Sequence, residues 1–363
     1  MDLKVEIKND VNQKEWDDML LSNKASSSYQ IYNFARIYKE AYDSKPIFIY
    51  VKNASGKIVG QLLTLIHNKR YWWDANVFTK TIGLKLNLHN SINWFYGPVI
   101  HNSENKELII NKFIIAIEEV VKTNSVTIIQ GGSAPLSDNS TDILFKNNGY
   151  DSTPWITYHI DLMQDIQSLY MNLKKSTRYD IRKSETTGLQ FEVVDKRETM
   201  NEFTRLKHEE KKRIGERLGS ATQSFFTDLL WKYFYNEGYE KLFLARFNGE
   251  AVGGIYGRIF NKNMIQYGVS NTPRKDLFVG PFLTWNVIKW AKEFGLESFD
   301  MGGANPNPKN EKEKQINFYK SKWGGELKEY SRFSKILSKK KNKLSSALRT
   351  PWRIPSKVVE KLK

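Results

Sequence analysis

An internal repeat is the feature of this sequence that most restricts its fold. Residues 46–66 read PIFIYVKNASGKIVGQLLTLI and residues 241–260 read KLFLARFNGEAVGGIYGRIF. In each, an apolar run rich in β-branched and aromatic residues leads into a glycine-containing turn, and the next run is entered through Val-Gly. This pattern is typical of a β-hairpin. The Val-Gly glycines, Gly60 and Gly253, are 193 positions apart.

Each hairpin is followed by a Tyr-Gly pair, a helical pattern and an apolar run that ends in Gly-Gly. These features lie at Gly97, 106–122 and Gly131-Gly132 in the first half, and at Gly268, 281–294 and Gly302-Gly303 in the second. The Tyr-Gly pairs and the Gly-Gly pairs are both separated by 171 positions. Two motifs at one offset predict a duplicated α/β domain with mixed sheets.

The length of 363 residues suits two domains of about 150 residues each. We expect the first domain over 1–154, the second over 155–333 with a mostly helical region at 196–238, and a basic tail over 334–363. Between its Val-Gly and Tyr-Gly motifs the first half has 22 more residues than the second (37 against 15), which predicts an elaboration that includes residues 71–78.

Composition excludes several kinds of site. The chain has no cysteine, which removes disulfides, thiolate nucleophiles and cysteine zinc sites. Its five histidines are scattered without metal-ligand spacing, so no metal site is expected. The polar N-terminal residues lack the apolar core of a signal peptide, and no run reaches the roughly 18 apolar residues of a membrane span. The sequence therefore predicts a cytoplasmic protein.

Positive charge gathers at the C-terminal end. Residues 334–363 carry ten Lys or Arg against one acid, so they hold +9 of the net charge of +16. Such a block suits a polyanionic partner, either anionic lipid or nucleic acid. A solvated tail that aids solubility is the alternative.

The segment 161–188 combines an apolar stripe with a row of cations. The stripe is formed by Leu162, Ile166, Leu169 and Leu173, and the row by Lys174, Arg178 and Arg182, all at helical spacing. This pattern predicts one helix that ends at Gly188. The cations suit a diphosphate or an RNA backbone. They equally suit a solvated face that pairs with nearby acids such as Asp180 and Glu185.

In this segment the string STRYDIRKSETTGLQFEV resembles the arginine-rich segment that opens the second half of the Fem family of peptidoglycan-bridge aminoacyltransferases. The resemblance continues through LFLARFNGEAVGG, QYGVS, PFLTWNVIKWAKEFG, SFDMGG and INFYKSKWGGE, and SSYQIYNFARIYKEAY resembles the family's opening. It covers nearly the whole chain to about residue 330. The family has two tandem GNAT-like domains, so the resemblance implies an α/β (α+β) fold with mixed central sheets, in keeping with the repeat.

What the resemblance implies is transfer of an aminoacyl group from aminoacyl-tRNA to an amine on a lipid- or nucleotide-linked envelope precursor. It implies no cofactor, metal or covalent enzyme intermediate, and a monomer at or near the inner membrane face. Such chemistry needs orientation and oxyanion stabilisation more than a nucleophile.

Lys320 matches the lysine of the family's FKxxFG-type motif, which implies that it stabilises the transition state or the leaving ribose hydroxyl. A surface lysine beside a turn is the alternative. Lys39 and Arg213 match basic positions that contact precursor phosphates. Tyr267 either presents its hydroxyl to the substrate or is a sheet residue, and Asp300 holds either its turn or the incoming amine. The further substrate-binding candidates are Arg178, Arg182, Tyr319, Gly302 and Gly303.

Two other functions stay open. A GNAT-type N-acyltransferase would take its acyl group from acyl-CoA or an acyl carrier and modify an amino sugar, polysaccharide or glycolipid precursor. Residues 270–281 offer a single glycine, Gly280, before the helix, which disfavours the pyrophosphate loop of CoA binding. The third hypothesis is a non-enzymatic protein that binds nucleic acid or membrane through its basic tail.

Overall fold

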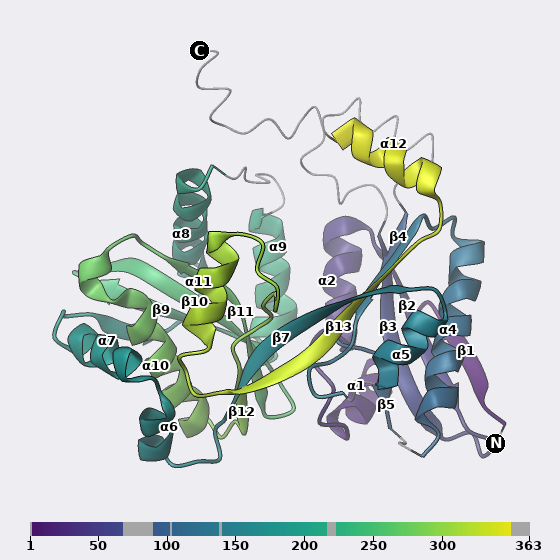
Figure 1. Cartoon of the computed structure of the whole chain (residues 1–363), viewed down its shortest axis with the longest axis horizontal. Helices are drawn as coiled ribbons and strands as arrows, with labels where there is room; N and C mark the ends of the chain where they lie inside the picture. Colours follow the sequence, from purple (N-terminus) through teal and green to yellow (C-terminus); the bar gives the residue numbers. More distant parts are fainter. Residues whose placement is uncertain (1, 68–89, 102–103, 138–139, 216–222, 350–363) are drawn as a thin grey trace. The chain divides into compact units, whose positions relative to one another are not determined.

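The structure, a computed structural model, describes residues 2–67, 90–101, 104–137, 140–215 and 223–349 (Figure 1). The chain divides into two compact units. Unit 1 comprises Met1–Pro154, Ala221–Phe226 and Tyr330–Lys363, and unit 2 comprises Trp155–Ser220 and Thr227–Glu329. The expected elaboration at 71–78 and the last part of the basic tail, 350–363, lie outside the described residues.

Unit 1 contains a mixed sheet in the order β1-β2-β3-β4-β6-β13, with β5 paired to β3. Its strands are β1 (Lys4–Lys8), β2 (Lys45–Lys52), β3 (Ile58–His67), β4 (Ser91–Asn93), β5 (Val99–Ile100), β6 (Ile128–Gly132) and β13 (Glu326–Ile336). Its helices are α1 (Gln13–Leu21), α2 (Tyr32–Tyr42), α4 (Lys106–Thr123), α5 (Ser140–Asn147) and α12 (Lys339–Arg349). The β4–β6 pair is parallel and the other pairs are antiparallel.

The strands of unit 2 pair in the order β7-β12-β11-β10-β9-β8 and are also of mixed direction. Its strands are β7 (Asp151–Asp161), β8 (Gln190–Val193), β9 (Glu240–Phe247), β10 (Glu250–Phe260), β11 (Asn263–Asn271) and β12 (Ser298–Asp300). Its helices are α6 (Ile166–Asn172), α7 (Lys175–Glu185), α8 (Met200–Arg213), the π-helix Trp231–Tyr235, the 3-10 helix Lys275–Leu277, α10 (Val279–Glu293) and α11 (Glu311–Lys320), while α9 (Gln223–Leu230) contributes to both units. Here β11–β12 is the parallel pair.

The two Val-Gly glycines of the repeat have the same structural cause. A Cβ on Gly60 would lie 2.9 Å from Ile109 of α4, and a Cβ on Gly253 would lie 2.4 Å from Val279 of α10. In each unit a helix therefore packs so closely on the second strand of the hairpin that a side chain has no room at the glycine. Both expected hairpins and both expected helices are present.

Unit 1 takes the last strand of its sheet from the C-terminal part of the sequence, because Arg332–Ile336 of β13 pair with β6. In unit 2, residues His159–Asp161 of β7 pair with β12. The expected boundary at residue 333 therefore falls inside a strand, and the first part of the expected tail is a strand end followed by helix α12. Phe333 anchors this strand by stacking on Phe145 at 4.3 Å.

The expected single helix over 161–188 is wrong. The chain forms α6 and α7, separated by Leu173 and Lys174 in extended conformation. Arg178 explains the break, because its Nη1 donates to the carbonyls of Met171 at 2.7 Å and Leu173 at 3.2 Å, which the end of α6 leaves without helical partners. The row of three cations is therefore interrupted at Lys174, which is the N-cap residue of α7.

Candidate active site

Lys320 is the last residue of α11, and its ammonium group is hydrogen-bonded to backbone carbonyls. Its Nζ donates to the carbonyl oxygens of Gly302 at 2.6 Å and Gly303 at 3.0 Å. The preceding loop is fixed by Asn305 and Asn310, whose side chains bond to Glu313 in the first turn of α11. The two glycines of the second Gly-Gly motif thus form a cradle for one ammonium group.

Gly302 must be a glycine for two reasons. Its φ of +76° lies in the left-handed region, and a Cβ would lie 2.4 Å from the carbonyl oxygen of Gln266 on β11. The Nζ of Lys320 is 3.6 Å from that same Cβ position. Strands β11 and β12 pair only as far as Ile265 and Asp300, after which β11 continues with β10 as its partner. Lys320 therefore lies at the point where two parallel strands separate.

Asp300, at the end of β12, stabilises the cradle through its carboxylate. It is 4% exposed, and its Oδ1 accepts hydrogen bonds from the Gly302 N–H at 2.7 Å and from the Thr157 hydroxyl of β7. Its register partner on β7 is His159. Burial raises the pKa of Asp300 above its ordinary value, and these hydrogen bonds and the charges of His159 and Lys320 offset only part of that rise.

Burial also changes the acidity of the lysine. It lowers the pKa of Lys320 to about 8, against the opposing effect of the Asp300 charge. An amine in that range is mostly protonated at neutral pH, yet it can release and regain a proton during a reaction. Lys320 can therefore act both as a hydrogen-bond donor and as an acid–base group.

Tyr319 lies beside Lys320 but points into the packing between α11 and α10. Its hydroxyl pairs with Thr284 of α10 at 2.8 Å, and burial raises its pKa far above the ordinary value. The same hydroxyl is 3.4 Å from the Cβ position of Gly280, in the first turn of α10. Tyr319 thus fixes α11 against α10.

Tyr267 does not reach the cradle with its hydroxyl. Its ring stacks on Tyr256 at 5.5 Å, and the Arg258 guanidinium lies 4.3 Å from the ring centre. Burial, and then the charge of Glu240, raise the pKa of the buried hydroxyl well above its usual value. This geometry corresponds to the sheet role that the sequence left open for Tyr267, not to a group that meets a substrate.

The remaining basic candidates are dispersed. Arg178 caps α6 as described, Arg182 donates to the Tyr170 hydroxyl at 3.2 Å, and Arg213 is exposed at the end of α8. Lys39 belongs to unit 1, where it lines a cavity of about 150 Å³ together with Arg36 and other residues of α2 and its neighbours. Of the predicted site residues, the structure brings together Lys320, Gly302 and Gly303, with Tyr319 adjacent.

The first Gly-Gly motif has a different environment from the second. A Cβ on Gly131 would lie 1.9 Å from the ring of Trp94, and Gly132 is the register partner of Arg332. In unit 1 this motif therefore gives room to a tryptophan inside a paired strand. The repeat that identifies the fold thus has a lysine cradle in unit 2 and packing in unit 1.

Two supporting residues were missed from the sequence, Thr157 and His159. The contact between Thr157 and Asp300 spans 143 positions, and no spacing rule connects residues so far apart. Within the ranges that the structure describes, no group of three or more His, Cys, Asp or Glu side chains could hold a metal ion. None of the described helices is both long enough and apolar enough to cross a membrane.

Comparisons with known proteins agree with this architecture. Residues 171–320 match a family described as an acetyltransferase (GNAT) domain, and this match ends at the cradle lysine. A search of curated proteins found no match.

Several solved structures share the fold. FemX has a TM-score of 0.72 and 14% identity over 93% of this chain and 99% of its own. A tandem GNAT protein from the clavulanic acid biosynthesis pathway has a TM-score of 0.57 and 11% identity over 92% of this chain and 98% of its own. The C-terminal domain of a putative lysylphosphatidylglycerol synthetase from Agrobacterium fabrum has a TM-score of 0.55 and 11% identity over 93% of this chain and 96% of its own.

Proposed function

We propose that this chain, a GNAT-type acyltransferase with the fold of FemX, transfers an aminoacyl group from aminoacyl-tRNA to an amine on a cell-envelope precursor. The observation that carries the proposal is the cradle, which holds the nitrogen of Lys320 by two backbone carbonyls. The sequence resemblance to the Fem aminoacyltransferases supports the donor. The shared fold with a putative lysylphosphatidylglycerol synthetase, whose name gives an aminoacylated lipid, supports an acceptor at the envelope.

In the proposed reaction the acceptor nitrogen attacks the ester carbonyl carbon of the donor, and the carbonyl electron pair moves to oxygen. The Lys320 ammonium donates a hydrogen bond to the developing negative charge and then its proton to the ribose oxygen as the carbon–oxygen bond breaks. The neutral lysine next takes the extra proton from the newly acylated nitrogen. The ribose hydroxyl thus carries the proton that Lys320 gave up, and the proton taken from the acceptor nitrogen restores the Lys320 ammonium.

Transfer assays with a panel of substrates test this function. The full chain is incubated with tRNA charged with individual labelled amino acids and with lipid-linked or nucleotide-linked muropeptides. We expect label to appear in the precursor in at least one combination. Absence of transfer across the whole panel, with correctly folded protein, would count against the aminoacyl donor.

An acyl-CoA donor is the second candidate, and the match of residues 171–320 to a GNAT acetyltransferase domain favours it. Titration calorimetry with acetyl-CoA separates the two. If the donor is aminoacyl-tRNA, we expect no tight acetyl-CoA binding, because residues 270–281, which lead into the first turn of α10, have only Gly280 to bring backbone N–H groups close to a pyrophosphate. Micromolar or tighter binding would instead favour N-acylation of an amino sugar, polysaccharide or glycolipid precursor.

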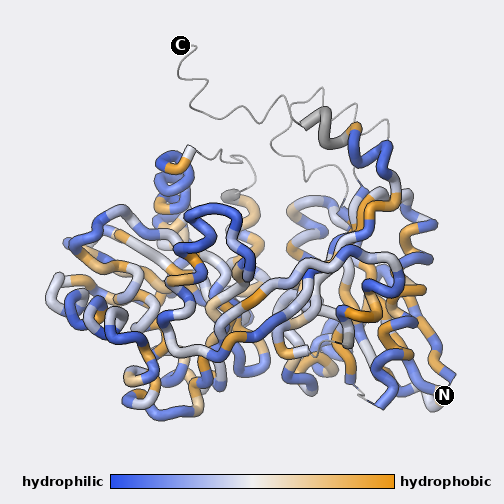
Figure 2. The backbone as a smooth tube through the Cα atoms, in the orientation of Figure 1, coloured by the Kyte–Doolittle hydropathy of each residue, from blue (hydrophilic) through white to orange (hydrophobic). Residues whose placement is uncertain are grey.

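The basic segment after β13 supports a peripheral contact with anionic lipid. Helix α12 starts with exposed Lys339 and Lys340 and continues to exposed Lys343, and Figure 2 colours its first part hydrophilic. Leu337 and Leu344 beside them are 37% and 44% exposed. Exposed cations with interspersed leucines are typical of interfacial helices. Each lysine near an anionic leaflet contributes roughly 1 kcal/mol.

Vesicle sedimentation tests the membrane contact. Replacing Lys339, Lys340, Lys341 and Lys343 by Gln is expected to abolish binding to phosphatidylglycerol vesicles. A control with the same charge change at the exposed Lys4, Lys24, Lys57 and Lys122 should retain it. Equal binding by both variants would refute a specific role for α12, and binding to unrelated RNA but not to vesicles would assign the segment to nucleic acid.

A further inference from the structure

The Lys320 ammonium group has two fixed hydrogen-bond partners, both of them backbone carbonyls. An ammonium group has three N–H donors. Two of them reach the carbonyls of Gly302 and Gly303, and these are its hydrogen-bond acceptors within the described part of the chain. One donor is left for a substrate. The direction of that donor is set by the two carbonyls, and so by the turn to which they belong.

Asp300 fixes the turn that contains Gly302 and Gly303. Its Oδ1 accepts the Gly302 N–H at 2.7 Å, and Gly302 is held at a φ of +76°. The Thr157 hydroxyl donates to the same carboxylate and lies 3.0 Å from the Gly302 carbonyl oxygen. One buried carboxylate therefore connects β7, β12 and the cradle. It is also the charge that opposes the effect of burial on Lys320.

We propose that Asp300 is the positioning residue of Lys320: it fixes the turn that holds the ammonium group, supplies its countercharge and so leaves one N–H directed at the reacting group. The identity of that reacting group rests on the proposed function, whereas the positioning itself does not. Asp300 has no contact with substrate in this scheme.

Several charged groups surround this pair and must be considered in any titration. Asp300 faces His159 and Lys320, and the groups that act on His159 in addition are Asp161, Glu326 and Lys328. Burial lowers the pKa of His159, so it is mostly neutral above pH 7. The charge of the Asp300 carboxylate is what favours the protonated form of Lys320 against burial.

The test is an NMR titration of Lys320 in the full chain, labelled at lysine Cε, with Lys320→Arg used to identify the resonance. We expect a midpoint near the value of about 8 in the wild type. In Asp300→Asn, which keeps the shape and an acceptor oxygen, the midpoint should fall by about one unit or more, because the opposite charge is gone. An unchanged midpoint in folded Asp300→Asn would overturn the proposal.

Two further variants keep the test decisive. Thr157→Val removes one hydrogen bond that lowers the pKa of Asp300, so the Lys320 midpoint should fall in the same direction by a smaller amount. This variant serves if Asp300→Asn does not fold. Asp180→Asn is the matched control, because Asp180 lies 3.8 Å from Lys322 rather than near the cradle, and it should leave Lys320 unchanged. A shift in the control as large as in Asp300→Asn would show a general electrostatic effect and refute the assignment.

These measurements need no substrate. A chain without aminoacyl transfer but with the expected titration would contradict the proposed function alone. A chain with transfer and an Asp300-independent midpoint would contradict the positioning role alone. In an active preparation, Asp300→Asn should also lower kcat at pH 8 more than it changes KM, because fewer lysines are protonated at that pH.

Discussion

The buried ion pair between Glu240 and Arg258 in unit 2 gives the clearest stability prediction. The two side chains are 0% and 7% exposed, are register partners on β9 and β10, and lie 3.5 Å apart. Arg258→Met should lower the free energy of unfolding by about 3–5 kcal/mol, because Glu240 would remain buried without its partner. Urea unfolding at pH 7 measures this loss.

The pH dependence of that variant follows from the carboxyl group. Burial already raises the pKa of Glu240, and loss of Arg258 removes the main opposing charge. A raised folded-state pKa stabilises the fold at low pH and loses that effect as pH rises through it. The loss in Arg258→Met should therefore be smaller at pH 5 than at pH 8, and Glu240→Gln/Arg258→Met should recover part of it. A pH-independent loss would contradict this account.

At the site, the sequence identified Lys320, Gly302 and Gly303 through a motif and a repeat. That the two glycine carbonyls accept hydrogen bonds from the lysine became clear only from the contacts in the structure. Tyr267 shows the limit of such reasoning, because a tyrosine at the end of a strand has the same sequence pattern whether its hydroxyl meets a substrate or a buried carboxylate.

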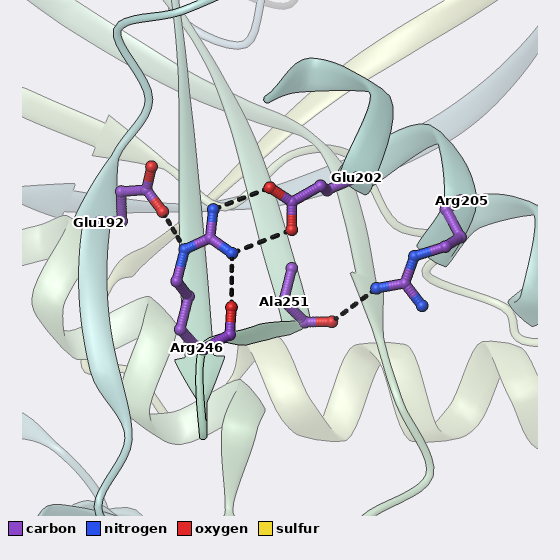
Figure 3. Close-up of polar contacts among 6 residues, drawn as sticks. Glu192, Glu202, Arg205, Arg246 and Ala251 are labelled. Atoms are coloured by element: carbon purple, nitrogen blue, oxygen red, sulfur yellow. Dashed lines mark hydrogen bonds and ion pairs between the residues drawn. The ribbon is translucent and has the colours of Figure 1, made fainter. Parts of the chain in front are cut away.

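Among the secondary-structure elements, edge strand β8 depends on one arginine. Arg246 of β9 donates through Nη1 and Nη2 to both oxygens of Glu202 in α8 at 2.9 and 2.8 Å, and through Nε to Glu192 of β8 (Figure 3). Arg246→Met should lower the free energy of unfolding by roughly 1 kcal/mol, since the network is partly exposed. It should also speed amide hydrogen exchange over Gln190–Val193.

Arg205→Met is the control for this prediction. Arg205 pairs with Glu209 of the same helix at 2.9 Å and donates to the Ala251 carbonyl at 3.3 Å, the contact that Figure 3 draws. Because its side chain is about half exposed, its loss should cost under roughly 0.5 kcal/mol. If both variants exchange alike at β8, the network does not hold that strand.

Local patterns predicted the elements well where local interactions decide them. Both hairpins and the helices α4 and α10 followed from periodicity and turn residues. The expected helix over 161–188 failed because Arg178 bonds to carbonyls five and seven positions earlier in the chain and stabilises a break. The helical spacing of the side chains in the sequence is the same on both sides of the break, so it does not indicate that one helix ends there.

For the molecule as a whole, the pairing of β13 with β6 makes the residues from Tyr330 onward part of the first unit. Phe333 is 2% exposed and stacks on Phe145. Phe333→Ala should destabilise unit 1 by about 3–5 kcal/mol, whereas Phe318→Ala, at a site 62% exposed, should cost little. Chemical denaturation of the full chain compares the two variants.

Truncation tests the same point. A chain that ends after Ser338 keeps all of β13 and should fold, while one that ends after Glu329 loses the strand that pairs with β6 and should not retain a stable unit 1. Equal stability of both truncations would contradict the dependence of unit 1 on β13. The sequence could not predict this pairing, because it joins residues about 200 positions apart and no local pattern specifies a strand's partner.

In the proposed reaction, the cradled Lys320 of unit 2 stabilises the transition state of acyl transfer. The most direct measurement is single-turnover transfer from aminoacyl-tRNA by Lys320→Ala, with folding checked by thermal unfolding. We predict a rate lower by on the order of 10²- to 10³-fold with little change in substrate affinity, and in the wild type a rate that falls as pH rises through about 8. Wild-type turnover by Lys320→Ala would contradict the account.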